Sequence, residues 1–487
     1  MKRFPRVALA ASAIVLSGAH QTSAVSRAIP GFALGGSIDT HDIVVPVENG
    51  REPMDQANLA TRLHPSLRAD ALRLENTPRQ GITSRQVFPS NWWPQGSEGI
   101  AARWNSQLRN YADWTTDRDN LAPTEKYDLL FYPGDHRRVD AIRAFPLAES
   151  RRPANERRNG ILRPATNVVG PTTAWELTNH GTYQNTYPES WWGHCNGWAS
   201  YVTAEKDAAP LHDILVRLEN DQIVMCAEPD PSCVLFRTAD IEALMSEIYF
   251  HDTSTVAGRR CNTARERIAR DARGRPIDPA CRDLNPATLH LALTGLLGQG
   301  APPLDNLNGP SEKLPFVMDY AYHDEVWTFP VIGYEIRSME YLTEAQAARL
   351  VCRGTMGAAG CRNYQWNENA TRFARVEMAV QVMAYETTNA GLLSFPLSRP
   401  GQPAEHTYHY VLEMDGRGTI LGGEWIVSPT SIGPNSKEMH PDFIFMAVKP
   451  EATSEDADDR GGRTDNPYIS SVHVRELLRL SRLPVGP

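Results

Sequence analysis

The seven cysteines constrain the fold of this 487-residue chain more than any other feature of its sequence. Six of them occur as three close pairs, which predicts local disulfides in an oxidising compartment. The predicted pairs are Cys226 with Cys233, Cys261 with Cys281, and Cys352 with Cys361, although other connectivities stay open. Cys195 is left over, and an unpaired cysteine is either a buried structural thiol or a nucleophile.

The N-terminus predicts export of the chain. Basic residues at Lys2, Arg3 and Arg6 precede an apolar run over 7–19, and small residues follow up to Ala24. This order is typical of a cleaved signal peptide over residues 1–24, and the apolar run is too short to span a bilayer. We therefore expect a secreted or periplasmic protein without a transmembrane segment. The net charge of −9 argues against nucleic-acid binding.

Hydrophobic periodicity predicts an α+β fold, since strands and helices do not alternate regularly. Alternating apolar runs predict strands at 289–293, 316–318, 331–336 and 408–414. Helical patterns occur at 241–249, 344–351 and 472–480, and 376–385 fits either helix or strand. Beyond the signal peptide, the predicted regions are an N-terminal extension or pro-region (25–85), a helical and linker region (86–165), a catalytic core (166–450), and an acidic loop with a C-terminal helix (451–487).

The segment around Cys195 is the strongest candidate for chemistry. Trp198, Ala199 and Val202 follow at the spacing of one helix face, which predicts a helix that begins at Cys195. A helix N-terminus favours the thiolate, the form of cysteine that attacks, and so we expect a lowered pKa. The neighbouring Trp192 and Trp198 either wall a substrate cleft or pack in the core.

A cysteine nucleophile needs a histidine base that a third polar group orients. His290 lies in one apolar run and Asp319 ends the next, which matches a papain-type arrangement with histidine and aspartate on adjacent strands. His409 with Glu424 is a second arrangement, and His440 is a third. Each of these histidines also has an ordinary structural interpretation as a hydrogen-bonded core imidazole.

The Trp-Trp-Gly-x-Cys-Asn-Gly-Trp-Ala segment around Cys195 resembles the transglutaminase elicitor family, known from oomycete and bacterial proteins. Residues 282–286, which lead to His290, look like the histidine segment of that family, and 316–319 look like its aspartate segment. Residues 326–334 are similar to its elicitor peptide, and 422–425 and 440–443 are similar to its C-terminal landmarks. The resemblance covers about residues 85 to 450.

The resemblance implies a papain-like cysteine core with a Cys195–His290–Asp319 triad. It also implies protein-glutamine γ-glutamyltransferase activity on protein substrates, and calcium as an ion on which the activity depends. No EF-hand pattern is present, so the ligands of a metal stay unknown, and the thiol chemistry itself needs no cofactor.

The expected reaction begins with attack of Cys195 on a glutamine carboxamide and ends with transfer of the acyl group to a lysine amine. The Cys195 backbone N–H and the side chain of Gln184 or Asn185 are candidate donors to the oxyanion. Two alternatives remain: a papain-like cysteine protease, which transfers the acyl group to water, and a non-catalytic secreted effector or surface protein. The oligomeric state is not predicted.

Overall fold

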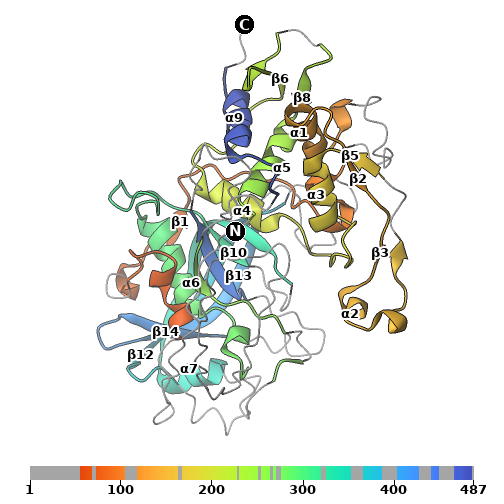
Figure 1. The fold of residues 1–487 in the computed structure, drawn as a ribbon. Helices are drawn as coiled ribbons and strands as arrows, with labels where there is room; N and C mark the ends of the chain where they lie inside the picture. Colours follow the sequence, from red (N-terminus) through yellow and green to blue (C-terminus); the bar gives the residue numbers. More distant parts are fainter. Residues whose placement is uncertain are drawn as a thin grey trace, which may run out of the picture.

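An antiparallel β-sheet forms the core of the lower half of the molecule in Figure 1. The structure is a computed structural model. It describes residues 55–68, 73–104, 118–162, 167–227, 230–250, 254–263, 267–269, 276–319, 325–351, 366–385, 403–426, 440–448 and 466–484. The expected signal peptide therefore lies outside the described residues.

The large sheet has eight strands. They are β1 (Gln80–Ile82), β9 (Ser254–Gly258), β10 (Phe316–Asp319), β11 (Thr328–Leu342), β12 (Arg372–Met383), β13 (Pro403–Met414), β14 (Ile420–Trp425) and β15 (Phe443–Ala447). Their order is β14-β13-β12-β11-β10-β15-β9, with β1 also paired to β11, and the sheet curls into a half-barrel. All four residues of β10 are buried because α4 packs against this central strand of the sheet.

Three smaller sheets lie outside the half-barrel. β2 (Arg137–Val139) pairs with β5 (Asn167–Val169), and β3 (Arg143–Ala144) pairs with β4 (Ile161–Leu162). β6 (Ile214–Glu219) lies between β7 (Gln222–Met225) and β8 (Val234–Phe236).

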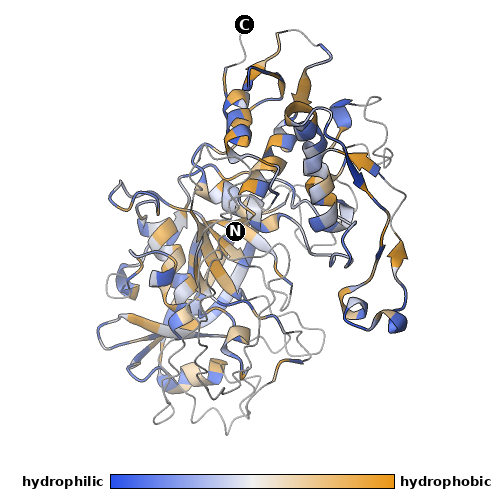
Figure 2. Ribbon diagram, viewed as in Figure 1, coloured by the Kyte–Doolittle hydropathy of each residue, from blue (hydrophilic) through white to orange (hydrophobic). Residues whose placement is uncertain are grey.

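The helices divide between the sheet and the upper part of the molecule (Figure 1). They are α1 (Pro123–Phe131), α2 (Leu147–Ser150), α3 (Pro171–Asn179), α4 (Cys195–Ala204), α5 (Thr238–Ile248), α6 (Pro286–Ala292), α7 (Glu344–Val351) and α9 (Ser471–Ser481). α4 contacts α5 on one side and β10, β11 and β15 on the other, so it joins the helical part to the sheet. Figure 2 shows hydrophobic residues along the strands, whereas α9 alternates hydrophobic and hydrophilic residues. No helix among the described residues is long and apolar enough to cross a membrane.

Most of the predicted elements of the core are confirmed. Strands occur at the expected places in β10, β11 and β13, and helices in α5, α7 and α9. The ambiguous segment 376–385 belongs largely to β12, whose pairing with β11 on one side and β13 on the other favours strand over helix. The segment 55–82 packs into the core, since Leu63, Leu67 and Leu74 belong to the main hydrophobic cluster.

The predicted strand at 289–293 is wrong, because His290 lies in helix α6. Pro286 occupies the first turn, and the Asn285 side chain accepts a hydrogen bond of 2.9 Å from the Ala287 N–H. This N-cap and proline are typical of a helix start, and a five-residue apolar run does not distinguish a strand from a buried helix. The expectation of histidine and aspartate on adjacent strands therefore fails at the histidine.

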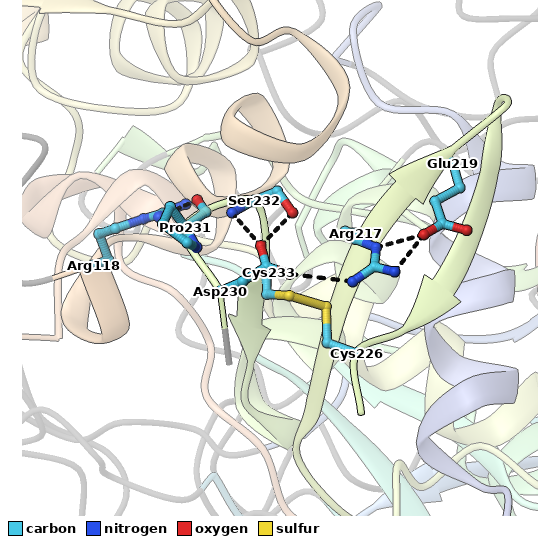
Figure 3. Close-up of a disulfide and its surroundings, with 8 residues drawn as sticks. All are labelled: Arg118, Arg217, Glu219, Cys226, Asp230, Pro231, Ser232 and Cys233. Carbon is cyan, nitrogen blue, oxygen red and sulfur yellow. Dashed lines mark hydrogen bonds and ion pairs between the residues drawn. A yellow bond between two sulfur atoms is a disulfide. The ribbon is translucent and has the colours of Figure 1, made fainter. Parts of the chain in front are cut away.

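Two of the three predicted disulfides are confirmed. Cys226–Cys233 closes the loop between β7 and β8 (Figure 3), and Cys261–Cys281 joins residues whose Cα atoms are 4.5 Å apart. In Figure 3 the loop is also held by Asp230, which accepts hydrogen bonds from Ser232 and pairs with Arg217. Cys352 and Cys361 lie outside the described residues.

Candidate active site

Cys195 is the first residue of α4, as predicted. Its side chain is a free thiol and the residue is 4% exposed. The chain enters the helix through a tight approach: a Cβ at Gly193 would lie 2.4 Å from the Trp92 carbonyl oxygen, which also accepts a hydrogen bond from the His194 N–H. A side chain at position 193 would collide with the Trp92 backbone, which explains the glycine in the Trp-Gly-His-Cys sequence. The hydrogen bond from His194 to Trp92 holds the residue before the helix in place.

Polar groups of β11 and of the segment after β12 surround the thiol. Thr328, the first residue of β11, and the Tyr385 hydroxyl lie close enough to Cys195 to favour its thiolate. Tyr385 donates a hydrogen bond of 2.8 Å to the Thr328 carbonyl oxygen. Burial outweighs these groups and raises the pKa of Cys195, which is opposite in direction to the effect expected from the helix N-terminus alone. The thiol is therefore protonated until a base accepts its proton.

Asp319 lies beside this pair of residues. It ends β10 and pairs with Thr328 across the β10–β11 ladder, so Cys195 and Asp319 both face the start of β11. Its Oδ1 accepts a hydrogen bond of 3.1 Å from the Trp327 N–H, and its buried Oδ2 has no hydrogen-bond partner among the described residues. Burial raises the pKa of Asp319 to about 7, and the nearby Asp283 carboxylate adds to the rise.

His290 has different neighbours. Its Nδ1 lies 2.8 Å from the Tyr410 hydroxyl on β13, and its buried Nε2 has no hydrogen-bond partner in the described part of the chain. Burial lowers the pKa of His290 to about 3. The structure thus places Cys195 and Asp319 around Thr328, and it hydrogen-bonds His290 to Tyr410 instead of to either of them.

The two alternative histidines also have defined positions. His409 is on β13 opposite Glu377, and Glu424 is on the adjacent β14 opposite Val411. His440 stacks on Trp425 with ring centroids 4.3 Å apart, and its Nδ1 lies 3.1 Å from Asp283 Oδ2. The negative charge of Asp283 also raises the pKa of Asp319. Asp283 is therefore a neighbour of both His440 and Asp319.

The remaining predicted site residues differ in exposure. Trp192 and Trp198 are buried, and Trp198 packs on Tyr385 with ring centroids 5.1 Å apart, so it contributes to the aromatic wall near the thiol. The Gln184 amide donates to the carbonyl oxygen of Gly181 and to the Gln95 side chain, and Asn185 is exposed.

Sequence reasoning missed a cluster of four buried ionisable residues next to Cys195. Glu176, His180, His194 and Glu247 each offer a ligand atom, and these atoms lie within 4.8 Å of one another. Burial alone would raise the pKa of Glu176, but His180 and His194 lower it to about 2. The spacing of Glu176 and His180 on one helix face was the available signal, whereas nothing local links them to Glu247.

Among the described residues, no group of three or more carboxylate side chains converges in the way that would mark the calcium site implied by the resemblance. Calcium takes about six to eight oxygen ligands. The groups of three or more candidate ligands found among the described residues contain either histidine nitrogens or the disulfide-bonded Cys226 and Cys233. The thiol chemistry at Cys195 has no step that requires calcium.

Comparison with known proteins agrees with the resemblance in the sequence. The sequence model of the transglutaminase elicitor family matches residues 184–457, a segment that includes Cys195, His290 and Asp319. The chain belongs to the transglutaminase elicitor family. Among solved structures it is similar to the GP42 transglutaminase from Phytophthora sojae, at 19% identity and a TM-score of 0.48, over 84% of this chain and 93% of that chain. A search of curated proteins gave no match.

Proposed function

We propose that this family member is a protein-glutamine γ-glutamyltransferase with Cys195 as its nucleophile. The observation that carries the proposal is the position of Cys195: it is a free thiol at the first residue of a helix, inside the segment that matches the family. The other four cysteines among the described residues are in disulfides.

The proposed reaction is an acyl transfer in two steps. The Cys195 sulfur attacks the carbonyl carbon of a glutamine side chain, and the nitrogen leaves as ammonia after it takes a proton, which forms a γ-glutamyl thioester. A lysine amine then attacks the thioester, loses a proton to the base and displaces the sulfur, which forms an isopeptide bond. The chemistry requires no cofactor, since the thiol supplies the nucleophile and a side chain moves the proton.

The family resemblance and the observed contacts point to different histidines as the base that accepts the Cys195 proton. The resemblance implies His290 oriented by Asp319. In support, among the described residues the buried His290 Nε2 has no hydrogen-bond partner, and the buried Asp319 carboxylate has only the backbone groups of Trp327 and Asp442 as hydrogen-bonding neighbours; such atoms often have a catalytic role. Their use requires the His290 ring to leave Tyr410. His440 is the rival, because it already pairs with Asp283, which lies near Asp319.

Burial of the thiol bears on the choice between glutamine transfer and hydrolysis. Cys195 is 4% exposed, so a glutamine side chain reaches the sulfur only after the covering side chains move. Tyr385 lies against Trp92, Trp198 and Trp327, and this aromatic group can exclude water from the thioester. Exclusion of water favours transfer to an amine over deamidation and over the protease alternative.

Two observations favour the non-catalytic alternative. The pKa of Cys195 is raised by burial, and His290 hydrogen-bonds to Tyr410 in place of the thiol. A thiol without a base is an inert core cysteine.

Ammonia release and amine incorporation test the proposal directly. The purified protein is incubated with a glutamine-containing protein, with and without a labelled primary amine, in calcium and in chelator. A transglutaminase releases ammonia and incorporates the amine, and Cys195→Ala abolishes both. A protease cleaves the backbone without releasing ammonia, and a non-catalytic protein does neither.

Variants of the two histidines identify the base. His290→Asn and His440→Asn are compared with His212→Asn, a partly exposed histidine outside the site whose ring nitrogens lie within hydrogen-bond distance of backbone carbonyl oxygens. Loss of amine incorporation in His290→Asn alone supports the family assignment, and loss in His440→Asn alone supports the rival.

We further propose that the protein acts outside the cytoplasm on protein substrates. The two disulfides support this location, because such bonds persist in oxidising compartments.

A further inference from the structure

Four buried side chains from three helices converge immediately behind the candidate nucleophile. Glu176 lies on α3 and His180 is its C-cap, His194 is the N-cap of α4, and Glu247 lies on α5. All four are at most 1% exposed. Two imidazoles and two carboxylates from separate elements therefore share one dry site.

Three of the distances between polar atoms in the cluster are longer than a normal hydrogen bond and are near those between ligands of one ion. His180 Nδ1 lies 3.5 Å from Glu176 Oε2 and 3.9 Å from Glu247 Oε2, and His194 Nδ1 lies 3.4 Å from Glu247 Oε2. Ligand atoms around a tetrahedral zinc ion with bonds of about 2.0–2.1 Å are roughly 3.3 Å apart. These three distances are near that spacing, and all four ligand atoms lie within 4.8 Å of one another.

The hydrogen bond at the other His194 nitrogen indicates its tautomer. His194 Nε2 lies 3.0 Å from Glu176 Oε1, and a carboxylate oxygen can only accept, so Nε2 carries the proton. In the neutral ring, Nδ1 then turns its lone pair toward Glu247 Oε2, which is also an acceptor. Glu176 Oε1 thus orients the His194 ring, while the second oxygen of the same carboxylate, Oε2, faces His180.

The surroundings hold the four ligands in place. The Asn466 N–H donates a hydrogen bond of 2.7 Å to Glu247 Oε1, which leaves Oε2 directed at the two histidines. The Phe250 ring packs on both imidazoles, with centroids 4.4 Å from His180 and 4.6 Å from His194. Gly99 closes another side, where a Cβ would lie 2.9 Å from Glu176 Oε1.

Charge also favours a cation at this place. Glu176 Oε2 is buried and has no hydrogen-bond partner among the described residues. Two buried carboxylates carry two negative charges, which either one divalent ion or two protonated imidazoles would neutralise. The donor set of two nitrogens and two carboxylate oxygens suits zinc, whereas calcium prefers oxygen ligands alone.

We propose that Glu176, His180, His194 and Glu247 bind one zinc-type divalent ion. The ion ties α3 and α5 to the residue that precedes Cys195, and so it fixes where α4 begins. Its ligands complete four-coordination without the thiol, so the site is structural and is distinct from the γ-glutamyltransferase chemistry. The proposal does not depend on that activity.

Metal binding by the full chain tests the proposal. The protein is stripped with EDTA, dialysed against excess Zn²⁺ and then against buffer, and its zinc content is measured by mass spectrometry. The expected content is one zinc per chain, with a rise in the thermal unfolding midpoint over the stripped protein. Co²⁺ in place of Zn²⁺ should give the visible absorption of a tetrahedral nitrogen–oxygen site.

Variants locate the ion. His180→Ala and Glu247→Gln should weaken zinc binding by at least about 100-fold, while Cys195→Ala and His212→Ala, a control at a partly exposed histidine outside the cluster, should retain it. If a ligand variant fails to fold, the zinc content of the wild-type protein still decides whether the site binds an ion. The rival model is a network of ion pairs in which both histidines are protonated and paired with the two carboxylates, without a metal. It predicts less than roughly 0.1 zinc per chain in the folded wild-type protein, and that result would overturn the proposal. The proposal is equally overturned if His180→Ala binds zinc as tightly as wild type.

Discussion

Gly197 gives the sharpest test of how the nucleophile is positioned. It is the third residue of α4, where the helix crosses α5, and a Cβ at this position would lie 2.1 Å from the Ser246 carbonyl oxygen. Ordinary contacts to a Cβ are 3.4–4 Å, and the atom it meets belongs to the backbone. Gly197→Ala therefore requires α4 and α5 to separate by about 1.3 Å locally, since 3.4 − 2.1 = 1.3.

Two opposing effects set the size of the change. Alanine in a helix interior is favoured over glycine by about 1 kcal/mol. Inserting a methyl group into a packed contact costs about 1–3 kcal/mol, and the upper end applies here because a backbone carbonyl cannot rotate away. We expect a net loss of about 2 kcal/mol in the free energy of unfolding, taking the difference of these two figures. We also expect reduced amine incorporation, because the shift of α4 moves Cys195.

Urea unfolding followed by circular dichroism and tryptophan fluorescence measures the effect. Gly96→Ala is the matched control, because Gly96 is exposed within a short 3₁₀ helix (Gln95–Ser97) and a Cβ there meets nothing within 4 Å. The control should match or slightly exceed wild-type stability. If Gly197→Ala is as stable as wild type, the close approach of α4 to α5 is not present in the protein and the reasoning fails.

Three further predictions concern charge and redox state. Asp319→Asn keeps an oxygen for the Trp327 N–H but can no longer act as a carboxylate, so amine incorporation should fall by roughly 10²- to 10⁴-fold with an unchanged unfolding midpoint; near-normal turnover would exclude Asp319 from the catalytic set. Burial raises the pKa of Asp128 from 3.8 to about 6 in the folded protein. As pH rises, the Asp128 carboxyl therefore loses its proton at a lower pH in the unfolded chain than in the folded protein. The free energy of unfolding should then fall between about pH 4 and pH 6. The loss at this residue is about 3 kcal/mol by linkage, and the fall should be smaller in Asp128→Asn when unfolding is measured across that range. Alkylation in denaturant without reductant, followed by peptide mapping, should label Cys195 and leave Cys226 and Cys233 unlabelled; a Cys195 found in a disulfide would contradict the nucleophile assignment.

Residue spacing in the sequence predicted the local structure correctly where the contacting residues are near neighbours along the chain. Cys195 begins α4 because the apolar residues after it repeat at helical spacing, and the loop disulfides Cys226–Cys233 and Cys261–Cys281 join near neighbours in sequence. The strand that ends at Asp319 is likewise a short apolar run that its own residues specify. His290 is the exception, because its apolar run suits a strand or a buried helix and the Asn285–Pro286 start signal decides between them.

Burial and long-range contacts decided the rest, because neither follows from spacing along the chain. A helix N-terminus lowers the pKa of a thiol, yet packing against β11 desolvates Cys195 and raises it. The neighbours of His290 and Asp319 depend on how the half-barrel curls, which brings Tyr410 to one and Thr328 to the other. The sequence by itself thus determined the family, the helix that begins at the unpaired Cys195, and the local disulfide loops. Only the tertiary structure brought Glu247 to the residue before Cys195, since α5 reaches α4 through packing and not through proximity in sequence.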